Sequence, residues 1–205
     1  MAKKNPVAEE YAKAAPYYES RWSFYVDSTT RNTIERMDMK PTDKVLDVGC
    51  GTGSLLYRLA SSCPEAQLSG FDLVPEMLDV ARRRLRDNVT LCAGLAEHIP
   101  FANNHFDIVI SCNMFHYIRN PGLALKEMYR VLRPGGQIVI TDWCHDYITC
   151  QLCELYLRIS NPAHFKIYRT KECKQMLEQA GYAQVEIERF KINWLWGLMT
   201  AKGKK

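Results

Sequence analysis

The sequence has no long apolar run, no export signal and no strong excess of charge of one sign. No stretch approaches the roughly 20 apolar residues that a helix needs to span a bilayer, and the first residues lack the apolar core of a signal peptide. The 205 residues include 27 Lys and Arg against 23 Asp and Glu, a near balance that gives no reason to expect nucleic acid as a partner. We therefore expect a cytoplasmic protein without a membrane span.

Internal repeats, low-complexity segments and long linkers are also missing, so one domain over residues 1–205 is the simplest expectation. The 8 cysteines, in a chain without an export signal, are expected to be reduced thiols rather than a disulfide framework. The last lysines of the chain are expected to belong to a solvated tail; they are Lys202, Lys204 and Lys205.

One glycine-rich turn organises the rest of the chain. Residues 44–48 form a short apolar run with β-branched side chains, which is typical of a strand buried on both faces, and a helix-compatible segment begins at Ser54. Between them stand Gly49, Gly51 and Gly53. The spacing differs from the dinucleotide fingerprint, and the carboxylate of Asp47 suits the amine of an amino acid better than a pyrophosphate. A tight turn without a ligand is the alternative.

A second acid stands at the end of the next predicted strand. Residues 67–71 predict a strand that ends in Asp72, about 20 residues after the glycine turn. A carboxylate there can accept hydrogen bonds from both hydroxyls of a ribose. Together, Asp47 and Asp72 indicate a ligand that carries an amine and a ribose, and the alternative is that Asp72 only caps the helix that follows.

Strands and helices alternate through the remaining chain, which predicts a parallel sheet with helices on both faces. A helical segment over residues 8–38, broken near Pro16, precedes the first strand. Its aromatic side chains are expected to form a lid over the glycine turn, or else to cover the edge of the sheet. The further predicted strands are residues 88–93, 106–111, 137–142, 183–190 and 194–201, of which the last two would form an antiparallel hairpin.

Four sequence blocks follow one another in a characteristic order. They are residues 45–53 (VLDVGCGTG), 70–78 (GFDLVPEML), 96–101 (AEHIPF) with 106–109 (FDIV), and 131–136 (VLRPGG), and a weaker fifth block covers 165–182. Through these blocks the sequence resembles the class I S-adenosylmethionine-dependent methyltransferases, and among them the small-molecule enzymes of the ubiquinone/menaquinone methyltransferase type (methyltransferase domain 11).

The resemblance implies an α/β fold, namely a Rossmann-like three-layer sandwich. Its mostly parallel seven-stranded sheet would have an antiparallel last strand and an N-terminal helical lid. The implied parts are the lid over residues 1–40, the cofactor-binding core over 41–142, acceptor-side helices over 143–181 and a C-terminal hairpin over 182–205. The implied cofactor is S-adenosyl-L-methionine.

The resemblance also implies roles for particular residues. Asp47 and the backbone of Gly49 would hold the methionine part of the cofactor, Asp72 the ribose, and the carbonyl of Asn113 the methionine amine. The other implied cofactor-binding residues are Gly51, Gly53, Leu73, Met77, Leu95 and Ala96, with Leu73 and Met77 flanking the adenine and Ala96 meeting its edge through the backbone. Because the family carries an acid where this chain has Leu95, the contact with the adenine amino group is lost or supplied by another group such as Glu97.

The acceptor is expected beyond the ends of two strands, where residues 113–116 and 143–147 would line a pocket opposite the lid. His116 and His145 are the candidate general bases, since imidazole titrates near neutral pH; each could equally be a hydrogen-bonded structural residue. The other residues expected in the acceptor pocket are Tyr17, Tyr18, Trp143, Tyr147, His164 and Tyr168. The acceptor would be a small, partly apolar molecule, and the attacking atom (N, O, C or S) stays open.

Three other functions remain open on the sequence. The thiols of Cys144, Cys150 and Cys153 could serve a metalloid or thiol methyltransferase, although such cysteines are more often small buried residues and no histidine stands at zinc-finger spacing, so no metal site is predicted. A non-catalytic subunit that activates a partner is the second. A nucleic-acid methyltransferase, the third, is disfavoured by the near-neutral charge and by the lack of an Asn/Asp-Pro-Pro-aromatic motif at residues 113–116. We expect a monomer or a homodimer.

Overall fold

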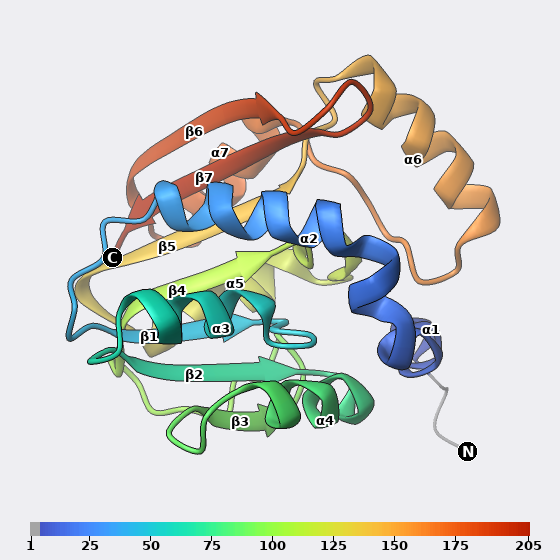
Figure 1. The fold of residues 1–205 in the computed structure, drawn as a ribbon. Helices are drawn as coiled ribbons and strands as arrows, with labels where there is room; N and C mark the ends of the chain where they lie inside the picture. Colours follow the sequence, from blue (N-terminus) through green and yellow to red (C-terminus); the bar gives the residue numbers. More distant parts are fainter. Residues whose placement is uncertain (1–4) are drawn as a thin grey trace.

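The computed structural model describes residues 5–205, so the first four residues of the predicted lid lie outside the described part. A seven-stranded sheet runs through the centre of the molecule, with helices on both faces (Figure 1). The strands are β1 Lys44–Val48, β2 Gln67–Asp72, β3 Thr90–Ala93, β4 Phe106–Cys112, β5 Leu132–Trp143, β6 Ala183–Lys191 and β7 Gly197–Lys204. The helices are α1 Pro6–Ala14, α2 Tyr18–Glu35, α3 Ser54–Ser62, α4 Pro75–Arg84, α5 Pro121–Val131, α6 Ile148–Ser160 and α7 Thr170–Gln179.

The order of strands in the sheet is β3-β2-β1-β4-β5-β7-β6. Strand β1 pairs in parallel with β2 and β4, and β4 pairs in parallel with β5, whereas β7 is antiparallel to both of its neighbours. This topology confirms the predicted Rossmann-like sheet with one antiparallel last strand. Because the parallel strands point the same way, their carboxyl ends meet at one edge, on the right in Figure 1.

Two apolar layers hold the helices to the sheet. Leu46 and Val109 face the layer formed with α5 and α7, and Val45 and Ile108 face the layer formed with α3 and α4. The alternation follows from the two-residue period of a strand, and strands buried on both faces read as continuous apolar runs in the sequence. In Figure 1, α2, α3 and α4 lie in front of the sheet, and α5 and α7 lie behind it.

The N-terminal helices occupy the carboxyl edge of the sheet. A short 3-10 turn, Ala15–Tyr17, separates α1 from α2 where Pro16 interrupts the helical pattern. Ala15 packs with Val74 and Met77 of the α4 region, which fixes this end of the segment over the strand ends. The rest of α2 runs back across the sheet with Tyr25 and Val26 buried, so the segment both covers the strand ends and shields the sheet.

Three predicted features of the C-terminal half are wrong in detail. The fifth strand begins earlier than predicted, since β5 starts at Leu132 rather than at residue 137 and its Gly135 N–H donates to the carbonyl of Lys205 at 2.8 Å. The terminal lysines are not a tail, since the strand β7 extends to Lys204 and the ammonium of Lys205 donates to the carbonyl of Tyr129 at 2.7 Å.

The third correction concerns the last hairpin, whose second strand begins at Gly197 rather than at residue 194. The side-chain oxygen of Asn193 accepts hydrogen bonds from the backbone N–H groups of Leu195 and Trp196 at 2.9 and 2.8 Å. This local turn removes those N–H groups from strand pairing and leaves Trp194 in an exposed loop. No helix in residues 5–205 combines the length and the apolar character needed to cross a membrane.

Candidate active site

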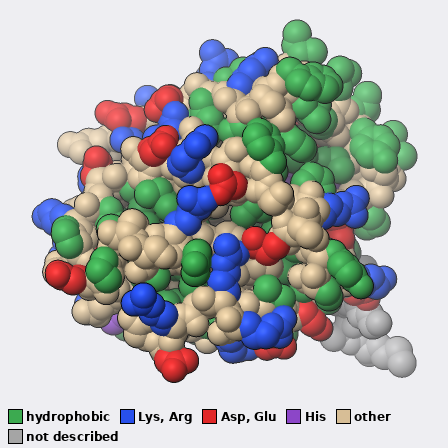
Figure 2. Space-filling view, in the orientation of Figure 1, with side chains coloured by type: hydrophobic (Ala, Val, Ile, Leu, Met, Phe, Trp, Pro, Cys, Tyr) green, Lys and Arg blue, Asp and Glu red, His purple; other side chains and the backbone are tan. Residues whose placement is uncertain are grey.

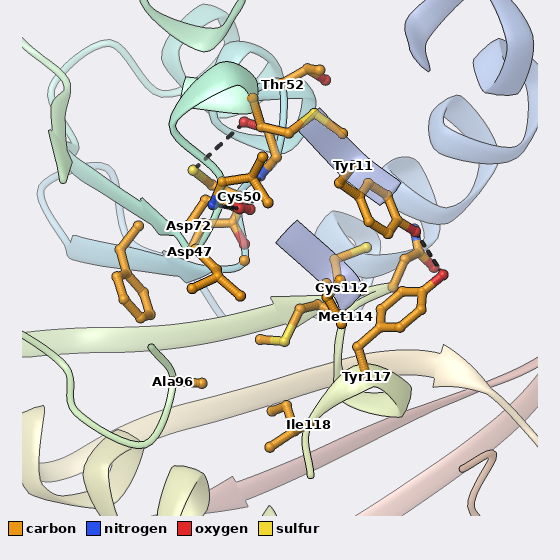
Figure 3. A pocket seen from close by; sticks show the side chains of 18 of the residues that line it. Tyr11, Asp47, Cys50, Thr52, Asp72, Ala96, Cys112, Met114, Tyr117 and Ile118 are labelled. Carbon is orange, nitrogen blue, oxygen red and sulfur yellow. Dashed lines mark hydrogen bonds between the residues drawn. The ribbon is translucent and has the colours of Figure 1, made fainter. Parts of the chain in front are cut away.

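A cavity lies where the ends of β1, β2 and β4 meet the N-terminal helices, and we name it the glycine-turn cavity (Figure 3). Nine of the ten predicted cofactor-binding residues line it: Asp47, Gly49, Gly51, Asp72, Leu73, Met77, Leu95, Ala96 and Asn113. The tenth, Gly53, is not part of the lining; it adopts a left-handed conformation at the N-terminus of α3. The sequence blocks therefore converge on one cavity.

The glycine turn leaves room for a ligand at one particular position. A Cβ atom built on Gly49 would lie 2.4 Å from the Cγ atom of Met114, so that glycine is needed for packing. A Cβ on Gly51 would meet nothing within 4 Å, although Gly51 lines the cavity and has a φ of +53°. The backbone at Gly51 is thus open to a ligand that approaches it closely.

Asp47 is a buried carboxylate in β1, next to the glycine turn. It is 2% exposed, and its Oδ1 atom has no hydrogen-bond partner in the described part of the chain. Burial, together with the nearby charge of Asp72, raises the pKa of Asp47 to about 7. A buried carboxylate in this state gains most from a cationic ligand group placed beside it.

Asp72 fastens the glycine turn to the segment after β2. Its Oδ2 accepts from the Gly51 N–H and its Oδ1 from the Val74 N–H, both at 2.8 Å. Burial raises the pKa of Asp72, and these backbone hydrogen bonds oppose that rise. The bond to the Val74 N–H closes a local turn before α4, and no side chain among the described residues caps that helix. Because the carboxylate also lines the cavity, it keeps lone pairs for a ligand.

The lid is held closed by polar contacts. Tyr11 of α1 and Tyr117 after β4 point toward each other, with their hydroxyl oxygens 2.6 Å apart (Figure 3). On the other side of the turn, Glu19 of α2 accepts from the Ser54 hydroxyl at 2.5 Å and pairs with Arg84 of α4 at 2.9 Å. These contacts join the N-terminal helices to both walls of the cavity, as a lid requires.

A second cavity, of about 650 Å³, adjoins the first, and we name it the aromatic cavity. The two share Tyr11, Tyr18, Asn113 and Tyr117 in their linings. Further rings around the aromatic cavity are Tyr17, Trp22, Tyr25, His116 and Trp143. Its volume is that of a site for a small organic molecule. The sequence placed Tyr17, Tyr18, Trp143 and His116 in such a pocket, and all four line it.

His116 is held by a buried carboxylate. Its Nδ1 lies 2.6 Å from Oδ1 of Asp142, and Oδ2 of the same residue accepts the His116 backbone N–H at 2.9 Å. The ring of Trp143 stacks on the imidazole at 5.5 Å. This arrangement fixes the Nδ1–H tautomer, so that Nε2, which has no hydrogen-bond partner among residues 5–205, is the nitrogen able to take a proton.

The other predicted acceptor-side residues do not line the aromatic cavity. His145 is turned toward Glu154, with its Nε2 2.7 Å from Oε2, and the ring of Tyr147 lies under Lys191. His164 and Tyr168 are buried, and the ring of His164 lies 6.0 Å from that of His116. Burial, with the charge of His116, lowers the pKa of His164 to about 4, so its ring is neutral.

The three cysteines singled out in the sequence are apart from both cavities. Cys144 and Cys150 are buried, and the Cys150 thiol donates to the carbonyl of Gly197 at 3.1 Å. Burial raises the pKa of all three thiols, that of Cys144 to about 12. Thiols in this state are poor ligands and nucleophiles, and the described residues contain no cluster suited to a metal ion.

Sequence reasoning missed two contacts in the walls of the cavities. The first is the pairing of His116 with Asp142, which joins the end of β4 to the end of β5. The sequence did contain a signal for this pair, namely a histidine after one predicted strand and an aspartate at the end of the next. The second is Tyr25, whose hydroxyl donates to Oδ1 of Asn113 at 2.8 Å. No sequence pattern indicates that contact, because it joins residues 88 positions apart.

These features define a class of protein. An open glycine turn, a buried acid whose Oδ1 has no partner within residues 5–205 and a second acid on the adjacent strand lie at the carboxyl edge of a Rossmann-like sheet, an arrangement that suits an adenosine cofactor that also carries an amine. Comparison with known proteins identifies the family. The model of the Methyltransferase domain family matches residues 39–181, and the chain belongs to this family of S-adenosylmethionine-dependent methyltransferases.

Individual relatives agree with this assignment. The malonyl-[acyl-carrier protein] O-methyltransferase of Hahella chejuensis is 35% identical over 154 residues, which are 74% of this chain; the chain spans about half (53%) of that relative. The demethylmenaquinone methyltransferase of Geobacillus is 29% identical, with 78% of this chain and 79% of that protein covered. A Haloferax volcanii putative methyltransferase, solved in complex with the Trm112 methyltransferase activator, shares the fold with a TM-score of 0.84 at 20% identity, over 95% of this chain and 97% of that one.

Replacing Asp47 with Asn should weaken binding of S-adenosylhomocysteine tens-fold at pH 8, because a charge-assisted contact with the ligand ammonium is worth about 1.5–3 kcal/mol. For the unsubstituted protein, affinity should rise as pH increases toward 7 and level off above it, since the ammonium pairs with the carboxylate and the pKa of Asp47 is about 7. Calorimetric titration over a pH series measures both effects.

The Asp47→Asn variant should also lose most of this pH dependence. If the variant keeps the full pH dependence of ligand affinity, that dependence comes from Asp72 instead, because burial raises the pKa of Asp72 as well. The stability of the free protein gives a second readout. Because the folded-state pKa of Asp47 lies above its ordinary value, its contribution to stability is lost as pH rises toward 7, so the variant should unfold at a higher temperature than the parent at pH 8.

Replacing Asp72 with Ala should also weaken binding of S-adenosylhomocysteine tens-fold or more. The substitution removes a carboxylate that can accept from both ribose hydroxyls, at about 1.5–3 kcal/mol for each charged hydrogen bond. It also releases the Gly51 N–H. Asp79→Ala is the matched control, because Asp79 is an exposed aspartate of α4 paired with Arg82. If the two variants bind S-adenosylhomocysteine with equal affinity, Asp72 does not contact the ligand and only holds the local turn before α4.

Replacing Leu95 with Asp should tighten binding of S-adenosylhomocysteine by a few-fold. Leu95 lines the glycine-turn cavity and is 48% exposed, so a carboxylate there could accept from the adenine amino group at a modest desolvation cost. Leu123→Asp, at an equally exposed leucine of α5, is the control and should bind like the parent. Weaker binding by a folded Leu95→Asp variant would mean that the leucine packs on the adenine, or that Glu97 already holds the amino group.

Proposed function

We propose that this protein transfers the methyl group of S-adenosylmethionine to a small hydroxylated aromatic acceptor in the aromatic cavity, with His116 as the general base. The observation that carries the proposal is the buried pair of His116 and Asp142 in the wall of the cavity that adjoins the cofactor site. The acceptor oxygen, or a ring carbon activated by it, would attack the methyl group.

The glycine-turn cavity fits the cofactor on grounds of its own. The unpartnered Oδ1 of Asp47 suits the ammonium group, and the open space at Gly51 suits a ligand in contact with the backbone. We assign Asp72 to the ribose, and Leu73 and Met77 to the adenine faces. When bound, S-adenosylmethionine supplies a methyl group on a positively charged sulfur, and that sulfur keeps the bonding electron pair when the methyl group leaves.

His116 would act on the acceptor rather than on the cofactor. With its Nδ1–H directed at Asp142, its Nε2 can take the proton of an acceptor hydroxyl as that oxygen becomes nucleophilic, and the carboxylate stabilises the imidazolium so formed. An amine acceptor has a lone pair in its neutral form and needs a base less than a hydroxyl does. The pair of His116 and Asp142 therefore favours an acceptor with an acidic O–H group.

The walls of the cavity support an aromatic acceptor. Trp143 and Tyr25 lie edge to face with ring centroids 6.4 Å apart, and Trp22 packs against Tyr25 at 6.3 Å. Such rings provide flat apolar surfaces on which another ring can pack. The relatives from Geobacillus and Staphylococcus aureus are named demethylmenaquinone methyltransferases, which agrees with a quinol-type acceptor.

The proposal is tested by measuring S-adenosylhomocysteine formation with a panel of acceptors. The panel contains phenols and naphthoquinols, aromatic and aliphatic amines, alkyl thiols and trivalent arsenic. We expect turnover with the hydroxylated rings and little with the other classes. Turnover confined to amines would refute the hydroxylated acceptor, and turnover confined to thiols or arsenic would support the alternative based on cysteines. Cofactor binding without turnover on any acceptor or in cell extract would support a non-catalytic subunit.

A further inference from the structure

Helix α6 exposes its apolar side to solvent. Ile148, Leu152, Leu155, Tyr156 and Ile159 are 63–84% exposed, and their spacing places them on one side of the helix. We name these five side chains the α6 apolar face. In Figure 2 hydrophobic side chains gather at the upper right, where Figure 1 places α6. Five large apolar side chains, each more than 60% exposed and side by side on one helix, form a candidate interaction surface.

The opposite side of α6 is polar and fixed to the protein. Glu154, the only acid in the helix, is 3% exposed; it lies 2.7 Å from His145 and 2.9 Å from Arg158. Cys150 adds its hydrogen bond to Gly197. These contacts set the rotation of the helix, so its apolar face points outward because its polar side is the one that is bonded to the protein.

Cations and an exposed indole ring lie on α6 itself or on segments joined to its start. Trp194, 79% exposed, stands in the loop between β6 and β7, which ends at Gly197, and the carbonyl of Gly197 accepts from Cys150 near the start of α6. Lys191 and Arg189 lie over the ring of Tyr147, the residue before α6, at 5.2 and 5.8 Å, and Arg158 is exposed near the end of the helix. The nearby acids are Asp146, 4.0 Å from Arg189, the buried Glu154, and Glu10 of α1, which accepts from the Asn161 side-chain amide just after the helix at 3.1 Å.

We propose that the α6 apolar face docks on an anionic membrane surface. An amphipathic helix with Leu, Ile and Tyr on the outside, flanked by Trp and by Lys or Arg, has the composition of a segment that lies in the membrane interface. Its cations complement the negative charge of the lipid headgroups. Leu157 of the same helix, with Asn161 and Ala163 just after it, lines the aromatic cavity. An acceptor dissolved in the membrane would therefore enter the cavity beside the docked helix, an inference that rests on the proposed function.

The size of the face favours a membrane over a second copy of the chain. The 13 residues of α6 span about 20 Å, so a face about 10 Å wide covers on the order of 200 Å². A stable protein interface covers about 800 Å² on each partner. A bilayer needs no matching surface of its own, and a single helix face embedded in the headgroup region is sufficient for reversible binding.

The test is co-sedimentation with vesicles of phosphatidylglycerol and phosphatidylcholine, and with vesicles of phosphatidylcholine alone. The protein should bind the anionic vesicles more tightly, and added salt should weaken that binding. The double substitution Leu155→Ser with Ile159→Ser should reduce binding about tenfold or more, since it removes two large side chains from the bilayer. Leu123→Ser, at a half-exposed leucine of α5, should bind vesicles like the parent.

The results separate this proposal from its alternatives. If the parent binds no vesicles, or if the double variant binds them equally well, the membrane proposal is overturned. It is likewise overturned if the parent is a dimer in solution that the double variant converts to a monomer without any vesicle binding. Both variants should bind S-adenosylhomocysteine and methylate a water-soluble phenol like the parent. A parent that binds vesicles but methylates no hydroxylated ring would refute the proposed function and leave membrane docking standing.

Discussion

Replacing Gly51 with Val is expected to abolish binding of S-adenosylhomocysteine while the protein stays folded. A side chain at Gly51 would meet no protein atom within 4 Å of its Cβ, so it would project into the glycine-turn cavity and occupy the space of the ligand. We expect affinity to fall more than about 100-fold, which corresponds to about 2.7 kcal/mol. Calorimetry measures the affinity, and circular dichroism confirms the fold.

The matched control for this substitution is Gly135→Val. Gly135 also has a positive φ, +76° against +53° at Gly51, and it too has no atom within 4 Å of an added Cβ. It lies at the start of β5, outside both cavities. The two variants share the backbone strain of a branched residue at positive φ, so only the loss of space in the cavity distinguishes them. Equal ligand affinities would show that the glycine turn is not the cofactor site.

Replacing His116 with Gln is expected to lower kcat about 100-fold or more without changing the affinity for S-adenosylhomocysteine. Glutamine preserves approximate size and can donate a hydrogen bond to Asp142, but it cannot take a proton from the acceptor. General-base catalysis contributes about 10²–10⁴-fold in rate, which sets the size of the loss. Steady-state kinetics with an accepted phenol or naphthoquinol measures kcat, and calorimetry measures the affinity.

His145→Gln is the matched control, because His145 is also paired with a buried acid but lies outside the aromatic cavity. It should keep the kcat of the parent. If His145→Gln loses turnover and His116→Gln does not, the assignment of the base is wrong.

The Asp142→Asn variant tests whether Asp142 positions the imidazole of His116. The amide can no longer favour the Nδ1–H tautomer, so kcat should fall, and a loss of cofactor affinity instead would show a merely structural role.

The order of the elements could be predicted because local sequence carries it. The apolar run at residues 44–48 and the glycines after it define a strand, a turn and a helix without reference to distant residues. The position of Asp72 follows from the same logic, because parallel strands end at one edge of the sheet. Nine of the ten residues predicted to bind the cofactor therefore line one cavity, and the tenth, Gly53, helps to form the turn without lining it.

The acceptor side could not be predicted equally well, because long-range pairs decide it. His116 and His145 each stand just after a predicted strand, so the sequence does not distinguish them. Their partners do: His116 pairs with Asp142 in the wall of the aromatic cavity, whereas His145 pairs with Glu154 and holds α6 in place. The apolar stripe of α6 has the periodicity of a helix that faces a core, yet it points outward, since Glu154 finds its partners inside. The local sequence pattern determines neither the rotation of α6 about its axis nor the pairing of each histidine with its carboxylate.

The placement of the four tryptophans gives the protein two optical reporters in one spectrum. Trp22, Trp143 and Trp196 are half-buried around Tyr25, with Trp22 and Trp196 6.3 Å apart, so their emission should lie toward the blue. Trp194 is exposed beside α6 and should emit toward the red. An aromatic molecule that enters the cavity would quench the blue component, whereas a lipid surface that covers α6 would shift the red component to shorter wavelength. Filling of the site and attachment to a bilayer can therefore be followed separately without any added label.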